Sequence, residues 1–463
     1  MLVPSAKLLR LTALVVLPLA TVAGILPAGA PLAVGLIVAF GLLVTFDAIR
    51  STGLLDGFSV TLPETIRLSN GRAGVIAVQL GNETERGTRL RMGLGLPAEL
   101  TTPNETAELQ LPDGASFAAI DWPITPQSRG RHRIGAAYLE VLSPFGLWEV
   151  RRRFATRCEA RVYPDLLGER QAVATVFLNR GANGAHAQRQ LGRGREFEKL
   201  REYLPGDAVD DIHWKATAKR SHPVTKVFQI ERTQEVYVLV DASRLSARES
   251  DVTAHGPAAP LPSVEIPAGT ETASAETTLE RCLKAALLLG AAAERQGDLF
   301  GVIAFDDQVR RFVRARNGRA HFAACRDGLH ALQARPVSPD FEELCSFVRL
   351  RLRRRALLIV LTSLDDPVLS ENFVRGVKLI ARQHLVLVVQ PRPRGARPLF
   401  GNPAVETIDD VYAEFSGHLR WQNLRNLEQT LRRGGVGFKL ADHGQLAAEA
   451  IRQYLDVKRR QIL

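Results

Sequence analysis

The feature that most constrains this chain is a run of 36 residues without a charge, Leu11–Phe46, close to its beginning. A single helix of that length would measure about 54 Å at ~1.5 Å per residue, against a bilayer hydrocarbon core of about 30 Å. The stretch Pro27-Ala28-Gly29-Ala30-Pro31 interrupts the run near its middle. We therefore expect a transmembrane helical hairpin within residues 1–50, with helices at Leu11–Leu26 and Leu32–Phe46.

The charges around this run predict its orientation. Lys7 and Arg10 precede the first helix and Arg50 follows the second, whereas the turn carries no positive charge. The positive-inside rule then places both ends in the cytoplasm. The alternative is a cleaved signal peptide with its cleavage site near Ala28–Ala30. The second apolar run, which follows that site directly, argues against cleavage.

The rest of the chain has the composition of a folded protein. Its 463 residues are enough for about three domains of ~150 residues each. A hydrophobic fraction of 46% excludes a wholly disordered chain. The four cysteines form no close pair, which argues against both a disulfide scaffold and a CxxC zinc site.

Residues 51–168 have the pattern of an all-β domain. Short alternating runs such as Gly74–Leu80 and Arg89–Leu94 are separated by turn residues, including Asn70-Gly71 and Asp113-Gly114. Several such strands predict a small β-sandwich. We interpret the stretch Ser143-Pro144-Phe145-Gly146-Leu147-Trp148 as a tight turn with an aromatic plug on the sandwich core.

Residues 235–463 alternate continuously apolar runs with amphipathic segments, which predicts a doubly wound α/β domain around a parallel sheet. In such sheets ligands bind at the carboxyl ends of the strands. The expected strands are Val236–Asp241, Leu299–Phe305, Ala356–Thr362 and His384–Val389, and the expected helices are Thr277–Gln296, Ala320–Ala334, Pro339–Arg354, Glu371–Arg382 and Leu446–Arg460.

A linker and a dense polar motif occupy residues 169–234. The motif contains Arg201-Glu202-Tyr203 and Gly206-Asp207, followed by Ile212-His213-Trp214-Lys215 and Lys219-Arg220. It resembles the signature of the DUF58 family, in which an Arg-x-Tyr-x-x-Gly-Asp block precedes an Ile-x-Trp-Lys block. The resemblance extends to the N-terminal hairpin, the sandwich and a C-terminal von Willebrand factor A-like domain. This sequence departs from the family pattern at Asp211 and His213.

The resemblance implies a membrane-anchored, non-catalytic accessory protein. It would act with a MoxR-type AAA+ ATPase in assembling or activating an unidentified protein client. The expected location is the bacterial cytoplasmic membrane, with the soluble domains facing the cytoplasm. Binding residues carried over from the signature are Arg201, Glu202, Tyr203, Gly206, Asp207, Trp214, Lys215 and Arg220.

Two interpretations of this signature remain open. Asp207 can pair with Arg201 or Lys215, with Tyr203 and Trp214 as an apolar plug, which would make the cluster a structural lock or a docking surface. The alternative is a metal-dependent hydrolase that uses the same cluster. The sequence contains no Gly-x-Ser-x-Gly, Walker A or His-Glu-x-x-His motif, which favours a non-enzymatic protein.

The A-like resemblance also implies a metal-dependent adhesion site, and with it a third interpretation as an adhesion protein. Asp241, Ser243 and Asp365 match part of that site. Leu245 stands where a second serine is usual, and the expected threonine is absent between Gly318 and Ala334. We therefore expect a degenerate site that binds no cofactor, Mg²⁺ being the ion it would otherwise take.

Two further features concern partners. The net charge is +11, with basic runs at Arg151–Arg153, Arg349–Arg355 and Lys458–Arg460. These runs have no interleaved aromatic residues, so we interpret them first as solvated surfaces, second as sites of attraction to a lipid bilayer, and only third as nucleic-acid contacts. The segment 247–276 contains four prolines and no aromatic residue, so we expect a disordered insert.

Overall fold

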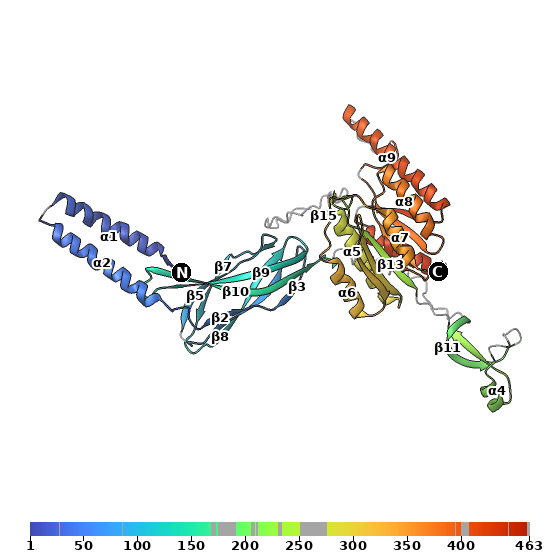
Figure 1. Ribbon diagram of the computed structural model, residues 1–463, viewed down its shortest axis with the longest axis horizontal. Coiled ribbons are helices and arrows are strands. Elements are labelled where there is room, and N and C mark those ends of the chain that lie inside the picture. The colour runs from blue at the N-terminus through green and yellow to red at the C-terminus, as the bar shows by residue number, and fades with distance from the viewer. Residues whose placement is uncertain are drawn as a thin grey trace, which may run out of the picture. The chain divides into compact units, whose positions relative to one another are not determined.

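The computed structural model describes residues 1–26, 28–85, 87–167, 173–174, 191–204, 209, 212–229, 234–250, 276–393, 395–399, 407–442 and 444–460. The chain divides into two compact units, Met1–Asp165 and Leu166–Leu463. Each unit is described by itself (Figure 1).

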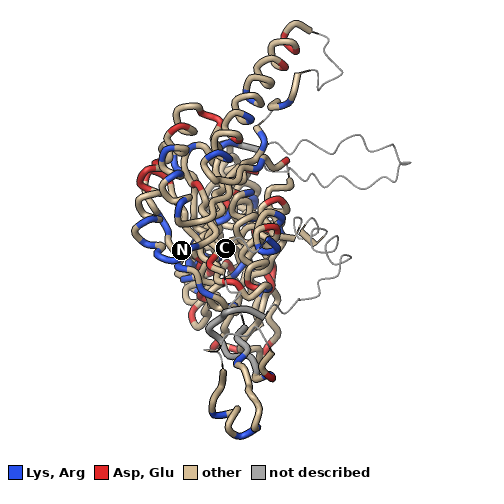
Figure 2. Tube along the Cα trace, turned by 90° about the vertical axis from the view of Figure 1, so that its right-hand side faces the viewer, with Lys and Arg blue, Asp and Glu red and all other residues tan. Residues whose placement is uncertain are grey.

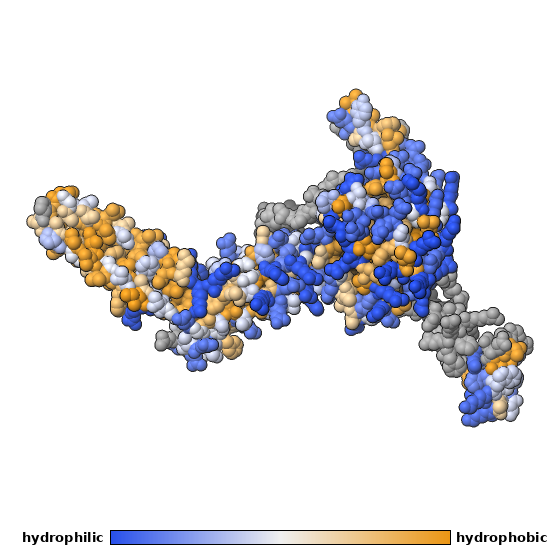
Figure 3. Space-filling view, in the orientation of Figure 1, coloured by the Kyte–Doolittle hydropathy of each residue, from blue (hydrophilic) through white to orange (hydrophobic). Residues whose placement is uncertain are grey.

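The first unit begins with two long apolar helices, α1 (Ala6–Ile25) and α2 (Ala30–Ser51). Ser5 caps α1 by accepting a hydrogen bond from the backbone N–H of Leu8, and Pro31 lies in the first turn of α2, where its missing N–H costs nothing. Both helices are long and apolar enough to cross a membrane, and Figure 3 shows their apolar side chains on the surface. The predicted helical pair is present; α1 begins five residues earlier than expected and ends one residue sooner, and α2 is longer at both ends.

Residues 58–163 form two sheets. One contains β1-β10-β9-β5-β7, with β3 also paired to β10, and the other contains β2-β4-β8-β6. All pairings are antiparallel except that of β3 with β10. The strands are β1 (Leu2–Pro4), β2 (Phe58–Thr61), β3 (Thr65–Ser69), β4 (Gly74–Asn82), β5 (Thr88–Leu94), β6 (Leu100–Thr101), β7 (Thr106–Leu111), β8 (Phe117–Pro126), β9 (Gly130–Leu142) and β10 (Trp148–Tyr163).

Both sheets contribute to one hydrophobic core. Ile76 and Trp122 come from one sheet and Met92 and Leu139 from the other, and all four are at most 1% exposed. Alternation of buried and exposed residues along β4 places every second side chain in this core.

The turn at Ser143–Trp148 joins these sheets to the helices, which corrects our interpretation of it. The turn is present, but Phe145 is 47% exposed, and the Trp148 indole donates to the backbone oxygen of Val44 in α2 at 3.0 Å. The fully buried carboxylate of Asp47 accepts hydrogen bonds from Ser143 Oγ at 2.5 Å and from the Phe145 N–H at 3.2 Å. The motif is therefore a clamp on the helix end, because its polar groups find their partners in α2 rather than in the sheet core.

The same turn also holds α1. The Ser5 hydroxyl donates to the Gly146 oxygen at 2.7 Å, and Lys7 Nζ donates to the Phe145 oxygen at 3.0 Å. Just before α1, strand β1 pairs with β10 in the register Leu2↔Val150. Both apolar helices are thus fastened to the sheets at one end.

The second unit contains a small hairpin module, residues 191–229. Strand β11 (Leu191–Glu202) pairs antiparallel with β12 (Val224–Gln229), and helix α4 (Trp214–Arg220) lies between them in sequence. His213 caps α4 by accepting from the Ala216 N–H. Most of the predicted linker lies outside the described residues.

The larger part of this unit is an α/β domain with a six-stranded sheet in the order β17-β16-β13-β18-β19-β20. Five strands are parallel, and the edge strand β17 is antiparallel to β16. The strands are β13 (Glu235–Asp241), β16 (Leu299–Phe305), β17 (Val309–Arg316), β18 (Leu357–Leu361), β19 (Leu385–Pro391) and β20 (Gly437–Ala441). A separate short pair consists of β14 (Glu249–Ser250) and β15 (Glu276–Thr277).

Helices cover both faces of this sheet (Figure 1). Alternate residues of β13 face opposite sides: Val238 belongs to one core with α5 and α10, and Leu239 to the other with α7, α8 and α9. Helices on both faces of a sheet were predicted, whereas the antiparallel edge strand β17 was not. The helices are α5 (Thr278–Arg295), α6 (Arg319–Leu329), α7 (Phe341–Arg351), α8 (Pro367–Ile380), α9 (Ile408–Arg433) and α10 (Leu446–Arg460).

Several expected bounds were wrong: α6 ends at Leu329 instead of Ala334, and α8 begins at Pro367 instead of Glu371. Strand β20 was not predicted. Helix α7 begins at Phe341, not at Pro339, because the Asp340 side chain caps it by accepting from the N–H groups of Glu342 and Glu343. Helix α9 was not predicted at all. Residues 251–275, most of the predicted insert, lie outside the described part of the chain.

Candidate functional site

The candidate site lies at the carboxyl ends of β13, β16 and β18. Because these strands are neighbours and run parallel, the residues that follow them meet at one edge of the sheet. Asp241 ends β13, Asp306 follows β16, and Asp365 follows β18. Two of these aspartates were predicted, and Asp306 was missed.

Asp241 is fully buried and its two oxygens have different partners. Oδ1 accepts from the Ser243 N–H at 2.8 Å, and Oδ2 accepts from Thr362 Oγ1 at 2.6 Å. Burial raises the pKa of Asp241 above its ordinary value, although the hydrogen bonds from Thr362 and Ser243 oppose the shift. The carboxyl group therefore ties the end of β13 to the residue that follows β18.

Asp365 is partly buried, with 23% of its side chain exposed. Arg248 Nη1 lies 3.3 Å from its Oδ2, and the Gln390 amide donates to its Oδ1. Burial raises the pKa of Asp365, whereas Arg248 and Gln390 act in the opposite direction. Gln390 is itself fully buried and accepts from the Leu364 N–H at 2.9 Å, so it fixes the loop that carries Asp365.

Asp306 is surrounded by cations. Arg310 Nε lies 2.8 Å from both of its oxygens, and Arg335 Nη1 lies 3.3 Å from Oδ2. Burial alone raises the pKa of Asp306, but hydrogen bonding with Asp307 and Arg310 outweighs it and leaves the pKa below its ordinary value. This aspartate is therefore a stable anion inside an ion-pair network.

These contacts do not fit a divalent cation. Mg²⁺ needs several free oxygens in an octahedral arrangement. Here protein donors contact both oxygens of each of Asp241, Asp306 and Asp365, and the side chain at the second serine position, Leu245, is apolar and buried. The described residues contain no group of three or more His, Cys, Asp and Glu side chains that could hold a metal. Arg248 lies beside Asp365 and supplies the positive charge that a metal ion would bring there.

The predicted signature residues lie in the hairpin module. Arg201 and Glu202 end β11, Tyr203 follows them, and Trp214, Lys215 and Arg220 lie on α4. Gly206 and Asp207 are outside the described residues. Trp214 is 66% exposed and α4 buries none of its residues, which corrects the expectation that this tryptophan is an apolar plug. Because α4 has only seven residues, it offers no buried face for a plug.

At least four contributors to the strand-end site were missed in the sequence: Thr362, Asp306, Arg248 and Gln390. Thr362 and Asp306 each directly follow an apolar strand, the position at which parallel sheets place functional residues, so that signal was available. Arg248 gave no such signal, since it lies seven residues beyond the end of β13.

Comparison with known proteins agrees with the predicted resemblance. The model of the family described as "Protein of unknown function DUF58" matches residues 199–255 and 263–406. Uncharacterized proteins of Mycobacterium bovis and Mycobacterium tuberculosis are 24% identical over 219 residues, 45% of this chain. The match spans 58% of the length of these relatives.

Two solved structures match part of this chain. The VWA domain of SpRpn10 shares 9% identity, with a TM-score of 0.27, over 48% of this chain and 95% of that domain. The conserved hypothetical protein BatB from Bacteroides thetaiotaomicron shares 15% identity, with a TM-score of 0.28, over 49% of this chain and 99% of that chain. The predicted resemblance to DUF58 is thus confirmed over residues 199–255 and 263–406.

Proposed function

We propose that this chain, which carries a DUF58 region and a von Willebrand factor A-like domain, is a non-catalytic scaffold attached to the bacterial cytoplasmic membrane. It would work with a MoxR-type AAA+ ATPase in assembling or activating a protein client. The ATPase would supply the energy, and the α/β domain would supply a recognition surface at the carboxyl edge of its sheet.

The observation that carries this proposal is that the carboxyl groups at that edge already have partners within the chain. Asp241, Asp306 and Asp365 are each engaged by donors from the same chain, so the site resembles a fixed surface rather than a reactive centre. Asp241 and Asp306 are buried, so they do not contact a partner themselves, but their hydrogen bonds hold the segments that follow the strands in one arrangement. This supports recognition over catalysis.

The attachment is supported by the first unit. The two apolar helices connect to the sheets through the Asp47 clamp and through pairing of β1 with β10. Cleavage near Ala28–Ala30 would remove β1 and the contacts of Ser5 and Lys7, which argues for retention of the helical pair as an anchor. We place the following soluble domains, including a β-sandwich at residues 51–168, in the cytoplasm, as the flanking positive charges indicate.

Affinity purification of the tagged full chain in mild detergent tests this function. The chain is isolated from its native host with ATP, ADP or a non-hydrolysable ATP analogue present, and bound proteins are identified by mass spectrometry. We expect an AAA+ ATPase to be enriched in at least one nucleotide state. Recovery of homo-oligomers alone in every state would contradict the proposal, and turnover of a substrate by the purified chain would favour the enzyme alternative.

A further inference from the structure

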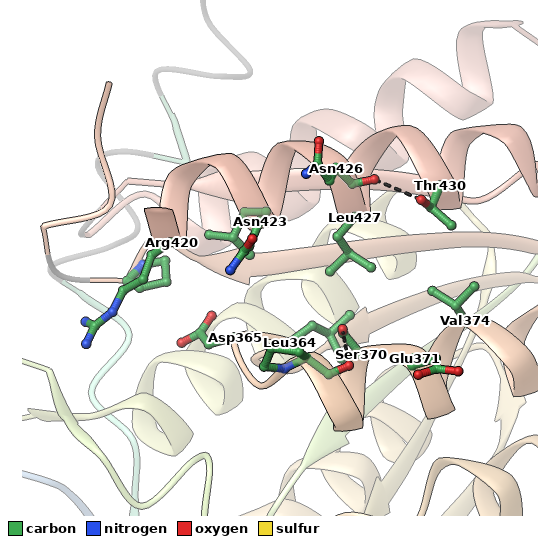
Figure 4. A pocket seen from close by; sticks show the side chains of 13 residues that line it. Leu364, Asp365, Ser370, Glu371, Val374, Arg420, Asn423, Asn426, Leu427 and Thr430 are labelled. Atoms are coloured by element: carbon green, nitrogen blue, oxygen red, sulfur yellow. Dashed lines mark hydrogen bonds between the residues drawn. The ribbon is translucent and has the colours of Figure 1, made fainter. Parts of the chain in front are cut away.

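A pocket of about 300 Å³ lies beside the candidate site, between α8 and α9 (Figure 4). The pocket is lined by Leu364 and Asp365, which follow β18, and by Pro393, which follows β19. It therefore opens at the carboxyl edge of the sheet, adjacent to Asp365 but distinct from the buried cluster around Asp241.

The pocket has an apolar wall and a polar end. Leu364, Val374 and Leu427 line its interior, whereas Asp365 and Arg420 lie together at one end (Figure 4). A volume of about 300 Å³ is at the lower limit of ligand pockets and accommodates one or two side chains. An occupant must therefore combine a small apolar group with a polar one.

Arg420 is available to such an occupant. It is exposed and, within the described part of the chain, has no ion-pair partner within 4.0 Å. The neighbouring Asp365 is already contacted by Arg248 and Gln390, and the charge of Arg420 lowers the pKa of Asp365 from beyond ion-pair distance. A guanidinium group with free donors at the mouth of an apolar pocket suits a carboxylate, which it can bind through two parallel hydrogen bonds.

The charges around the pocket favour a peptide over a polyphosphate. Asp365 and Glu371 line the pocket together with Arg420, so the lining offers one guanidinium and suits a single carboxylate better than a chain of phosphates with several negative charges. Figure 2 shows basic and acidic residues interspersed along the described trace. The backbone of a nucleic acid also offers no small apolar group for the wall formed by Leu364, Val374 and Leu427.

We propose that the pocket between α8 and α9 binds an acidic peptide segment of a protein partner without a metal ion. One Asp or Glu side chain of the peptide pairs with Arg420, and a neighbouring aliphatic or aromatic side chain enters the apolar interior. This inference rests on the proposed function, because it names the chemistry recognised at the scaffold's binding edge.

Selection from a peptide library tests the inference. Random twelve-residue peptides displayed on phage are selected on the detergent-solubilised full chain in the presence of EDTA, and enriched peptides are resynthesised for fluorescence anisotropy. We expect peptides in which Asp or Glu lies within two residues of Leu, Ile, Met or Phe. Arg420→Gln and the pocket-filling Asn423→Trp should each weaken binding at least tenfold.

Two variants serve as matched controls. Arg353→Gln removes an exposed arginine that precedes the amino end of β18, at the opposite edge of the sheet. Gln422→Trp places the same tryptophan one residue away from Asn423, outside the pocket. Both controls should bind within about twofold of the wild type, since neither alters the pocket.

The inference is wrong if enriched peptides lack an acidic residue, if Arg420→Gln and Asn423→Trp bind normally, or if Arg353→Gln weakens binding as much as Arg420→Gln. The inference is also wrong if no peptide binds and the chain instead binds vesicles of phosphatidylglycerol, or single-stranded DNA. In that outcome Arg420→Gln would abolish the binding of the vesicles or the DNA. If the ATPase still co-purifies with the wild type in that case, only this inference fails. If no ATPase is recovered in any nucleotide state, the proposed function fails whatever the peptides do.

Discussion

Thr362 Oγ1 donates a hydrogen bond of 2.6 Å to the buried carboxyl group of Asp241, linking the ends of the two central strands β13 and β18. Burial disfavours the charged form of Asp241 and raises its pKa, although the hydrogen bond from Thr362 opposes this shift. A neighbouring aspartate, Asp306, has a lowered pKa. The two carboxylates should therefore affect stability with opposite dependence on pH.

We expect Asp241→Asn to stabilise the protein at neutral pH. As pH rises above the ordinary value of 3.8, the unfolded wild type loses this proton before the folded one does, so wild-type stability falls until the raised pKa is passed. Asparagine carries no such penalty: its Oδ1 can accept from the Ser243 N–H, and its Nδ2 can donate to Thr362 Oγ1, which then acts as acceptor instead of donor. The gain should vanish below about pH 4, and melting temperatures from pH 3.5 to 8 would show it. An equal gain at all pH values would contradict the assigned pKa shift.

Asp306→Asn should have the opposite effect. The lowered pKa of Asp306 means that its charged form stabilises the fold above the ordinary value of 3.8, and this contribution is lost as pH falls through the lowered pKa. The variant should therefore melt at a lower temperature than the wild type at pH 7 and approach it at acidic pH. A variant as stable as the wild type at pH 7 would show that the Arg310 and Arg335 contacts contribute nothing net.

Magnesium should not stabilise the chain. A site with a Kd of ~1 mM would add about 1.4 kcal/mol of stability in ~10 mM Mg²⁺, which shifts a melting temperature by several degrees. Because Arg248 and protein hydrogen bonds engage Asp241 and Asp365, we expect no such shift between Mg²⁺ and EDTA. A magnesium-dependent rise that Asp241→Ala abolishes would establish an ion site instead.

The Asp47 clamp should control local opening of the Ser143–Trp148 turn. Asp47→Ala leaves the Ser143 hydroxyl and the Phe145 N–H without their acceptor, at a cost of about 1–3 kcal/mol. Hydrogen exchange of peptides that cover this turn should accelerate by roughly fivefold or more. Asp56→Ala is the control, because Asp56 has a side chain that is 76% exposed and an ion pair with Arg152 at the surface. Equal protection of the turn from hydrogen exchange in Asp47→Ala and Asp56→Ala would contradict the role of the clamp.

Helix α9 offers a matched pair of leucines. Leu424 is 3% exposed and packs in the domain core, whereas Leu419 is 44% exposed. Truncation of a buried leucine to alanine costs about 2–5 kcal/mol, but surface changes usually stay within ~0.5 kcal/mol. In denaturant unfolding, Leu424→Ala should therefore lose much more free energy of unfolding than Leu419→Ala. Similar losses in both would mean that the exposed side of α9 is covered.

The same helix shows why part of the fold could not be predicted. Its core face uses Gly417, Leu424 and Leu431, spaced by seven residues, while Ile408 and Phe415 are exposed. Apolar residues on both sides of a helix remove the amphipathic pattern that identified α5 and α10. The apolar strands were predictable because strands buried on both faces read as continuous apolar runs.

The candidate site was predictable only in part. Asp241 and Asp365 follow apolar strands, so their position at one edge of the sheet could be inferred. Their partners Arg248 and Gln390 could not, since those contacts join loops and strands distant in sequence. The role of Asp47 was hidden for the same reason, because its partner Ser143 lies 96 residues away.

Cysteine accessibility in spheroplasts of a bacterial expression host tests the central claim, a membrane anchor that holds the soluble domains in the cytoplasm. The four native cysteines are buried, so single introduced cysteines report cleanly. With Ala28→Cys between the helices and Asp56→Cys after them, a membrane-impermeant maleimide should label intact spheroplasts only at position 28, and position 56 only after lysis. Labelling of position 56 in intact spheroplasts, or a mature chain that lacks residues 1–30, would contradict the account.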